Sequence, residues 1–275
     1  MVTSTRSPRV RTARSLAKRA LRERSRLFLA EGPQAVREAL GRSGQAGLIR
    51  ELFVTAAARS RHAELVAAVT SAGAPVHEVS VEVMAELAQT VTPQGLLAVC
   101  PFIDVPLTAL VSAAPRLIVV LANIRDPGNA GTVLRTADAA GADGVIFAGA
   151  SVDAYNSKCV RSSAGSLFHL PLVLGVPVAD AVAALRGAGL GVLAADGSAT
   201  LGLDDLDQAG RLALPTAWLF GNEAWGLPAD LVALADKAVA VPIYGHAESL
   251  NLAAAAAVCL YASARAQYGG AAQSR

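Results

Sequence analysis

The sequence predicts an α/β fold in which a parallel sheet flanked by helices follows a smaller α/β unit. Strand-like and helix-like segments alternate along residues 116–267, and this order favours a parallel sheet with helices on both faces. Residues 116–121, Arg-Leu-Ile-Val-Val-Leu, form a nearly continuous apolar run, which is typical of a strand buried on both sides. The chain has 275 residues, 53% of them hydrophobic, which is enough for two domains with buried cores.

The first 100 residues are expected to form the smaller unit. Strands are predicted at residues 28–30, 51–55, 76–79 and 96–100, and helices at 33–41, 61–72 and 81–87. Pro33 is suited to the first position of a helix, and the turn former Gly95 directly precedes the last of these strands. Residues 101–116 contain three prolines around a short helix-compatible piece and are predicted to be a linker. The predicted domains are therefore residues 1–100 and 117–268.

Beyond the linker the alternation becomes regular. Strands are predicted at residues 116–121, 144–148, 191–195, 217–220 and 237–241, and helices at 130–140, 178–187 and 250–267. Gly141 is positioned to end the first of these helices, because glycine is common just past a helix C-terminus.

The net charge of +2 hides an asymmetric distribution. Residues 6–26 contain nine lysines and arginines and a single glutamate. Such a cluster indicates attraction to a polyanion, nucleic acid first, with a solvated tail as the alternative. Apolar residues between the charges favour a partly helical segment over a tail. The candidate nucleic-acid-binding residues are Arg9, Arg11, Arg14, Lys18 and Arg19.

Several classes of protein have no support in the composition. No uncharged apolar run reaches the roughly 18–20 residues of a membrane helix, and no apolar stretch follows the basic N-terminus as in a secretory signal. The three cysteines are odd in number and widely spaced, which fits neither a disulfide framework nor a zinc site. We therefore expect buried free thiols, a reducing cytoplasm, no bound metal and no membrane association.

Three segments carry most of the functional information: residues 123–135, 220–228 and 241–251. Each one combines Gly, Asn and isolated charges where a predicted strand ends. In open α/β sheets, ligands bind at the carboxyl ends of the strands. The three segments are therefore candidates for parts of one site.

Each segment also has a plain structural interpretation. Asn129 is predicted to cap the helix at 130–140, with Arg135 further along it, and Ser249 to cap the last helix, with Asn251 in its first turn. The second segment reads equally as an ordinary loop, although its glycines permit close approach to a ligand and Glu223 is an isolated charge. Taken singly, the segments leave both interpretations open.

In combination, the three segments closely resemble the SpoU (TrmH-like) family of RNA 2′-O-ribose methyltransferases, in the SPOUT superfamily. Asn129 with Arg135 matches the first motif of that family, Gly221–Glu223 the second, and Pro242 with Ser249–Asn251 the third. The resemblance covers about residues 117–267.

A weaker resemblance covers the N-terminal part. Residues 8–100 are similar to the L30e-like RNA-binding domain often found upstream, with residues 28–33 and 92–100 as the matching stretches. In the methyltransferase part, Trp225 departs from the pattern, since the family more often has a small or polar residue there.

The resemblance implies a C-terminal trefoil knot, which is a rare exception to the rule against knots, and a homodimer. It also implies S-adenosylmethionine as the cofactor, with Gly221, Val241 and Leu250 as the cofactor-binding residues. The residues with implied catalytic roles are Asn129, Arg135, Glu223, Ser249 and Asn251. Arg135 is assigned in the family to activation of the hydroxyl, but a guanidinium is a poor base, so a phosphate clamp is the alternative role.

Ribosomal RNA is the expected substrate, because the two-domain layout resembles the ribosomal members of the family. Transfer RNA, methylation of a base instead of a ribose, and a binding protein without catalysis are the alternatives. A nucleotide-dependent oxidoreductase or hydrolase is disfavoured, since no Gly-x-Gly-x-x-Gly follows a strand and no phosphate-binding loop is present.

Overall fold

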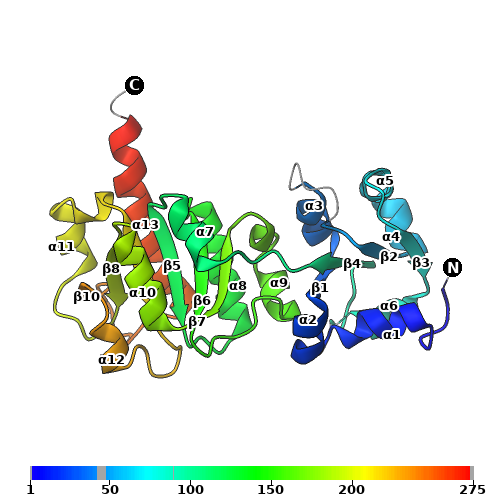
Figure 1. The fold of residues 1–275 in the computed structure, drawn as a ribbon, viewed down its shortest axis with the longest axis horizontal. Coiled ribbons are helices and arrows are strands. Elements are labelled where there is room, and N and C mark those ends of the chain that lie inside the picture. Colours follow the sequence, from blue (N-terminus) through cyan, green and yellow to red (C-terminus); the bar gives the residue numbers. More distant parts are fainter. Residues whose placement is uncertain (1, 42–47, 89, 273–275) are drawn as a thin grey trace. The chain divides into compact units, whose positions relative to one another are not determined.

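The computed structural model describes residues 2–41, 48–88 and 90–272, and the chain divides into two compact units (Figure 1). The first unit comprises the residues up to Ile103 together with Tyr155–His169, and the second comprises Asp104–Ala154 and the residues from Leu170 onward. A short segment from the middle of the chain therefore belongs to the N-terminal unit.

The first unit contains a sheet with the strand order β1-β4-β2-β3. Its strands are β1 (Leu27–Glu31), β2 (Glu51–Thr55), β3 (Val76–Val79) and β4 (Leu96–Pro101), and its helices are α1 (Pro8–Ser15), α2 (Arg19–Ser25), α3 (Pro33–Gly41), α4 (Ala56–Arg61), α5 (Ala63–Ser71), α6 (Val81–Leu87) and α9 (Ser157–Ser162), with a 3-10 turn at Ser166–Phe168. Strand β4 runs antiparallel to both β1 and β2, whereas β2 and β3 are parallel.

The N-terminal basic segment is an integral part of this unit. Val10, Ala13 and Leu16 are buried in the same hydrophobic cluster as Met84 of α6 and Phe53 of β2. The expectation of a helical segment instead of a tail is therefore confirmed, because α1 places one apolar face in the core while its arginines lie outside it.

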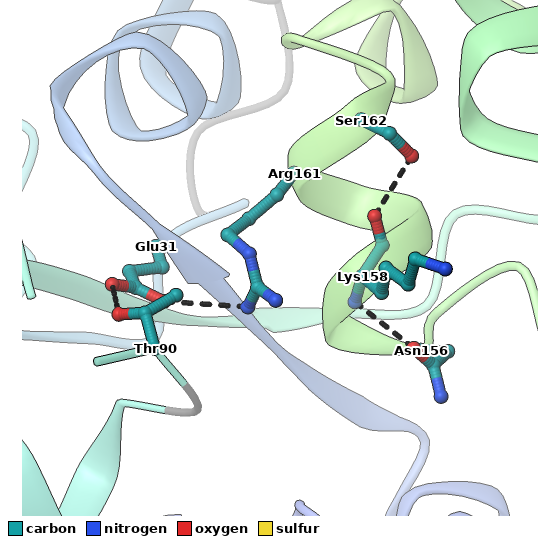
Figure 2. Close-up of polar contacts among 6 residues, drawn as sticks. All are labelled: Glu31, Thr90, Asn156, Lys158, Arg161 and Ser162. Carbon is teal, nitrogen blue, oxygen red and sulfur yellow. Dashed lines mark hydrogen bonds and ion pairs between the residues drawn. The ribbon is translucent and has the colours of Figure 1, made fainter. Parts of the chain in front are cut away.

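Helix α9 is joined to β1 by an ion pair. The Arg161 guanidinium lies 3.4 Å from a carboxylate oxygen of Glu31, and the Thr90 hydroxyl donates to the other oxygen at 2.6 Å (Figure 2). The side chain of Glu31 is only 7% exposed, so this charge is well shielded and needs both partners. Asn156 caps α9 by accepting from the Lys158 backbone N–H at 2.9 Å.

The second unit is a six-stranded sheet with the strand order β10-β8-β9-β5-β6-β7, and every neighbouring pair is parallel. Its strands are β5 (Leu117–Ala122), β6 (Gly144–Ala148), β7 (Leu172–Val176), β8 (Gly191–Ala195), β9 (Thr216–Phe220) and β10 (Lys237–Val239). Its helices are α7 (Leu107–Ser112), α8 (Pro127–Ala139), α10 (Val178–Gly187), α11 (Leu203–Gln208), α12 (Ala229–Val232) and α13 (Leu252–Ala272), with a 3-10 turn at Arg211–Ala213.

Helices cover both faces of this sheet, as Figure 1 shows. One face packs Ile118, Val120 and their neighbours against α7 and α10. On the other face α13 lies against α8 and β9, and the Trp218 indole donates to the Ser263 hydroxyl at 2.9 Å. All six residues of β5 are buried, which confirms the continuous apolar run as a strand covered on both sides.

The predicted helix at residues 61–72 is confirmed as α5, which begins two residues later, at Ala63. The preceding helix α4 was not predicted. Thr55 caps it by accepting from the Ala58 backbone N–H at 3.3 Å, and His62, at φ −121°, separates α4 from α5. The predicted strand at 237–241 ends at Val239. Strand order alone does not determine whether a chain passes through a loop, so the trefoil knot stays a prediction.

Candidate active site

The three motif segments follow β5, β9 and β10 at the carboxyl ends of these strands. Strands β5 and β9 are parallel neighbours, with Leu121 opposite Phe220 at their ends. The loop after β5 and the loop after β9 therefore start side by side. The third segment runs from the end of β10 to the start of α13, which packs on the same sheet.

Glu223 connects the first two segments. One carboxylate oxygen accepts from the Arg125 backbone N–H at 3.2 Å, and the other accepts from the Asp126 backbone N–H at 3.1 Å and from the Asn129 side-chain amide at 3.3 Å. These donors lie at the start of α8, where unpaired N–H groups and the helix dipole favour an anion. The carboxylate thus holds the loop after β5 in one conformation.

The predicted N-cap of this helix was wrong. Helix α8 begins at Pro127, and Asp126 caps it by accepting from the Asn129 backbone N–H at 2.8 Å. Pro127 occupies the first helical position, where a missing N–H has no consequence. Asn129 therefore lies in the first turn, and its side chain is free of capping and able to reach Glu223.

The third segment joins the same network through Asn251. Its side-chain amide donates to the Asn129 side-chain oxygen at 3.1 Å. Its own oxygen accepts from the Ala253 backbone N–H at 2.9 Å, so Asn251 directly precedes α13 and the expected cap at Ser249 was wrong. We call Asn129, Glu223, Asn251 and the backbone N–H groups of Arg125 and Asp126 the Glu223 network.

The loop after β9 is rigidly built. Asn222 and Gly226 exchange two backbone hydrogen bonds of 2.9 Å each. Asn222 is only 5% exposed, and its side-chain amide donates to the Asn123 carbonyl at 2.9 Å, which ties this loop to the loop after β5. A Cβ atom at Gly221 would lie 2.4 Å from the Gly226 backbone, so only glycine fits there. Asn222 was not predicted as a site residue, and its only signal in the sequence was its place inside the second motif.

A cavity of about 400 Å³ lies between these segments. Among the predicted site residues it is lined by Gly221, Glu223, Val241, Ser249, Leu250 and Asn251. Asp196 and Gly197, which follow β8, also line it and were not anticipated from the sequence. The three predicted cofactor-binding residues thus line one cavity, whereas Asn129 reaches it only through its hydrogen bonds.

Arg135 lies further along α8 and is exposed. In the described part of the chain its guanidinium has no hydrogen bond or ion pair, and it does not line the cavity. Arg125 is a second exposed arginine, at the entrance to α8, and sequence reasoning gave it no role. Its guanidinium lies 5.9 Å from the centre of the Trp225 ring.

The predicted nucleic-acid-binding residues lie on α1, on α2 and between them. Three of them form surface ion pairs: Arg9 with Glu51 at 3.3 Å, Arg14 with Glu86 at 2.8 Å and Arg19 with Glu23 at 2.7 Å. Arg11 and Lys18 have no such partner among the described residues, and with Arg14 they line a shallow hollow of about 700 Å³. This charged surface is available to a polyanion.

All three cysteines are buried free thiols, as expected. Burial raises the pKa of the Cys259 thiol to about 12, and it also raises the pKa of Cys100, so both remain protonated at neutral pH. Within the residues that the structure describes, no group of three or more His, Cys, Asp or Glu side chains is arranged to hold a metal ion, and no helix is long and apolar enough to cross a membrane.

Comparison with known proteins matches residues 116–261 to the SpoU rRNA Methylase family. The chain belongs to this family. Residues 7–98 of this SpoU chain match the MRM3-like substrate binding domain. The three motifs and the sheet that positions them all lie within the SpoU match.

Full-length relatives support the assignment to the SpoU family. A 23S rRNA guanosine 2′-O-methyltransferase of Bacillus subtilis is 32% identical over 94% of this chain and 97% of its own length. The crystal structure of an AdoMet-bound rRNA methyltransferase from Sinorhizobium meliloti has a TM-score of 0.81 at 32% identity, covering 96% of both chains. The SpoU methyltransferase AviRb from Streptomyces viridochromogenes, in complex with AdoMet, has a TM-score of 0.82 at 30% identity over 96% of this chain and 100% of that one.

Proposed function

We propose that this protein transfers a methyl group from S-adenosylmethionine to a ribose 2′-hydroxyl in ribosomal RNA. The observation that carries the proposal is the Glu223 network, in which side chains from all three motifs meet beside a cavity. The full-length relative that methylates a 2′-oxygen of 23S rRNA supports the same reaction and favours ribosomal over transfer RNA.

The residues of the cavity fit S-adenosylmethionine. The cavity has a volume of about 400 Å³, which is within the range of small-molecule sites. Because Gly221 has no side chain, it presents its backbone to the cavity. Val241 and Leu250 supply apolar walls for an adenine ring, and carboxylates such as Asp196 suit a cationic ligand. When bound, the cofactor supplies an activated methyl group on a sulfonium.

The remaining residues divide into positioning and contact roles. Both oxygens of Glu223 are engaged by N–H donors, so we assign it to holding the first loop and not to proton transfer. Asn251 orients the Asn129 amide by donating to its oxygen. We assign Ser249, at the rim of the same cavity, to supporting the ribose.

Arg135 is proposed to contact the RNA directly. A guanidinium stays protonated at neutral pH because its pKa lies above about 12, so it cannot readily accept a proton from the ribose hydroxyl. Its planar group is well suited to a bidentate clamp on the adjacent phosphate, which orients the 2′-hydroxyl. The proton then goes to phosphate or to water.

The N-terminal unit is proposed to select the RNA. The L30e-like domain, residues 1–100, would present its basic helices to phosphates, and residues 101–116 would link it to the methyltransferase domain, residues 117–268. The match of residues 7–98 to a substrate binding domain supports this division of roles. A ribosomal RNA substrate agrees with the cytoplasmic location expected from the free cysteines.

We also propose a homodimer, with α13 in the interface. Val258, Tyr261 and Tyr268 are exposed on this helix beside a hollow of about 680 Å³. An apolar helix face of this kind favours burial against a second copy. Light scattering of the wild-type protein should give twice the mass of one chain, and the mass measured for Tyr261→Asp should be closer to that of a monomer. If the wild-type protein is a monomer at micromolar concentration, the proposed dimer is refuted.

The test of the function is transfer of labelled methyl to unmodified 23S rRNA, followed by nuclease digestion and mass spectrometry. The expected product is one 2′-O-methylated nucleoside. A methylated base would reject ribose chemistry, a product found only with transfer RNA would reject the ribosomal substrate, and no product with either RNA would leave a binding protein as the better description.

A further inference from the structure

We propose that Trp225 and Arg125 form a stacking site for an unpaired RNA base next to the methyl-accepting ribose. The inference rests on the proposed RNA methyl transfer and adds a base-binding site to it. Trp225 is 58% exposed, whereas the other tryptophan of the protein, Trp218, is fully buried.

The loop holds Trp225 in a fixed position. Asn222 and Gly226 close the loop around it with two backbone hydrogen bonds, and the Ala224 backbone N–H donates to the Asn222 side chain at 2.9 Å. Gly226 has a φ of +68°, a conformation that residues with a side chain rarely adopt. A rigid loop lowers the entropic cost of binding on its exposed aromatic ring.

Arg125 completes a mixed aromatic and cationic surface. Its guanidinium lies 5.9 Å from the centre of the Trp225 ring, within the range of a cation–π contact. Its backbone N–H is held by Glu223 at 3.2 Å, so the Glu223 network positions this pair as well. Aromatic rings and guanidinium planes are the groups on which proteins stack unpaired RNA bases.

The location favours RNA as the occupant. Trp225 lies between Ala224 and Gly226, and both of these residues line the cavity assigned to the methyl donor. A nucleotide whose ribose approaches that cavity would bring its own base, or a neighbouring one, to the adjoining exposed ring. The positive charge of Arg125 suits the phosphate that accompanies the base.

Intrinsic fluorescence tests the site directly, because the chain has two tryptophans and only Trp225 is exposed. An unmodified 23S rRNA transcript should quench the emission of the wild-type protein, and it should leave the emission of Trp225→Ala, which comes from buried Trp218, unchanged. Unquenched wild-type emission at saturating RNA would overturn the inference, whether or not methyl transfer occurs.

Steady-state kinetics of Trp225 variants provide a second test of the stacking site. Base stacking on an aromatic ring predicts that Trp225→Ala raises the KM for RNA by roughly 5- to 150-fold, with the KM for S-adenosylmethionine unchanged. Trp225→Phe should restore most of the affinity, and Leu214→Ala, which removes another exposed apolar side chain, should have no effect. An equal rise in the KM for RNA in the Phe and Ala variants, or no rise in either, would reject stacking on Trp225. Methyl transfer by the wild-type protein would still support the proposed function in that case.

Discussion

The basic helices of the first unit and the Glu223 network of the second unit use charge in opposite ways. On α1 and α2 many cations share one surface, and several are paired singly with exposed carboxylates such as Glu86 and Glu23. In the Glu223 network one carboxylate receives three N–H donors from the start of α8. The first arrangement is redundant, and the second depends on a single group.

The difference indicates what each region can do. Exposed ion pairs contribute little to stability and exchange partners readily, so the basic helices suit long-range attraction to RNA. A carboxylate bonded to backbone N–H groups fixes the relative position of two loops, which is what alignment of reacting atoms requires. We therefore expect single substitutions to have large effects in the network and small, salt-dependent effects on the helices.

The largest effect is expected for Arg135→Ala. Loss of the proposed phosphate clamp should lower turnover by at least about a hundredfold, because misplacement of a reacting group costs that much. Cofactor affinity, measured by calorimetry, should stay near the wild-type value, since Arg135 does not line the cavity. Arg135→Lys should rescue only in part, because lysine cannot form the bidentate contact. Normal turnover in the alanine variant would remove Arg135 from the mechanism.

Glu223→Ala is expected to have the next largest effect. Three donors at the start of α8 would lose their acceptor. Loss of a hydrogen bond to a charged group costs about 1.5–3 kcal/mol where the group is shielded from water. The cost is smaller here, because Glu223 is exposed and water can replace the carboxylate. We expect a roughly 10- to 100-fold loss of turnover, because the loop after β5 would no longer be held in position, and only a modest decrease in the free energy of unfolding.

Glu223→Gln separates the two explanations for this loss. The glutamine keeps one acceptor oxygen in place, so a positioning role predicts partial recovery of turnover, whereas a role as proton acceptor predicts none. A pH–rate profile in which the Gln variant loses the acidic limb would also contradict positioning.

Much of the fold could be predicted because its signals are local. Buried strands such as β5 and β6 are short apolar runs, and the helices between them follow glycine or proline boundaries. One error, at the start of α8, arose because two side chains compete for the same capping role. Asp126 and Asn129 are both good N-caps, and the deciding feature was Pro127, which prefers the first helical position after the cap.

The candidate site was less accessible to local reasoning. Asn129 is 94 residues from Glu223 and 122 residues from Asn251, so no pattern within a helix or strand connects them. Only the family resemblance grouped these residues in advance. The resemblance included Asn222 in its second motif but gave it no role, and Asn222 proves to be a buried side chain that joins two loops. The resemblance did not include Asp196, which follows β8 and lines the cavity.

Arg22 is an exception among the cations of the basic helices. Like Glu223, it is a single charged side chain that forms several hydrogen bonds to the backbone. It is only 3% exposed, and one nitrogen donates to the carbonyls of Leu16 and Ala17 at 2.7 and 2.8 Å. Arg22→Met should lower the free energy of unfolding by about 1–3 kcal/mol, since the buried Leu16 carbonyl and the part-buried Ala17 carbonyl both lose a donor. Arg19→Met, at an exposed ion pair, should cost less than about 1 kcal/mol in the same chemical denaturation experiment.

The smallest effect is expected for Arg11 and Lys18, two cations of the basic surface that have no ion-pair partner among the described residues. Arg11→Gln with Lys18→Gln should weaken RNA binding a few-fold and reduce the slope of log affinity against log salt by about 1 to 2. Deletion of residues 1–26 would be a poorer test, because Val10 and Leu16 belong to the core and their loss would unfold the unit.

The matched control removes the same charge from α4. Arg59→Gln with Arg61→Gln leaves α1 and α2 intact, so the salt slope should stay at the wild-type value if the hollow beside Arg11 is the contact surface. Filter binding across a series of salt concentrations measures both slopes. If the two double variants reduce the slope equally, the basic helices attract RNA only through the overall charge of the unit. No single cation of the first unit would then be essential, in contrast to Glu223, on which its network depends.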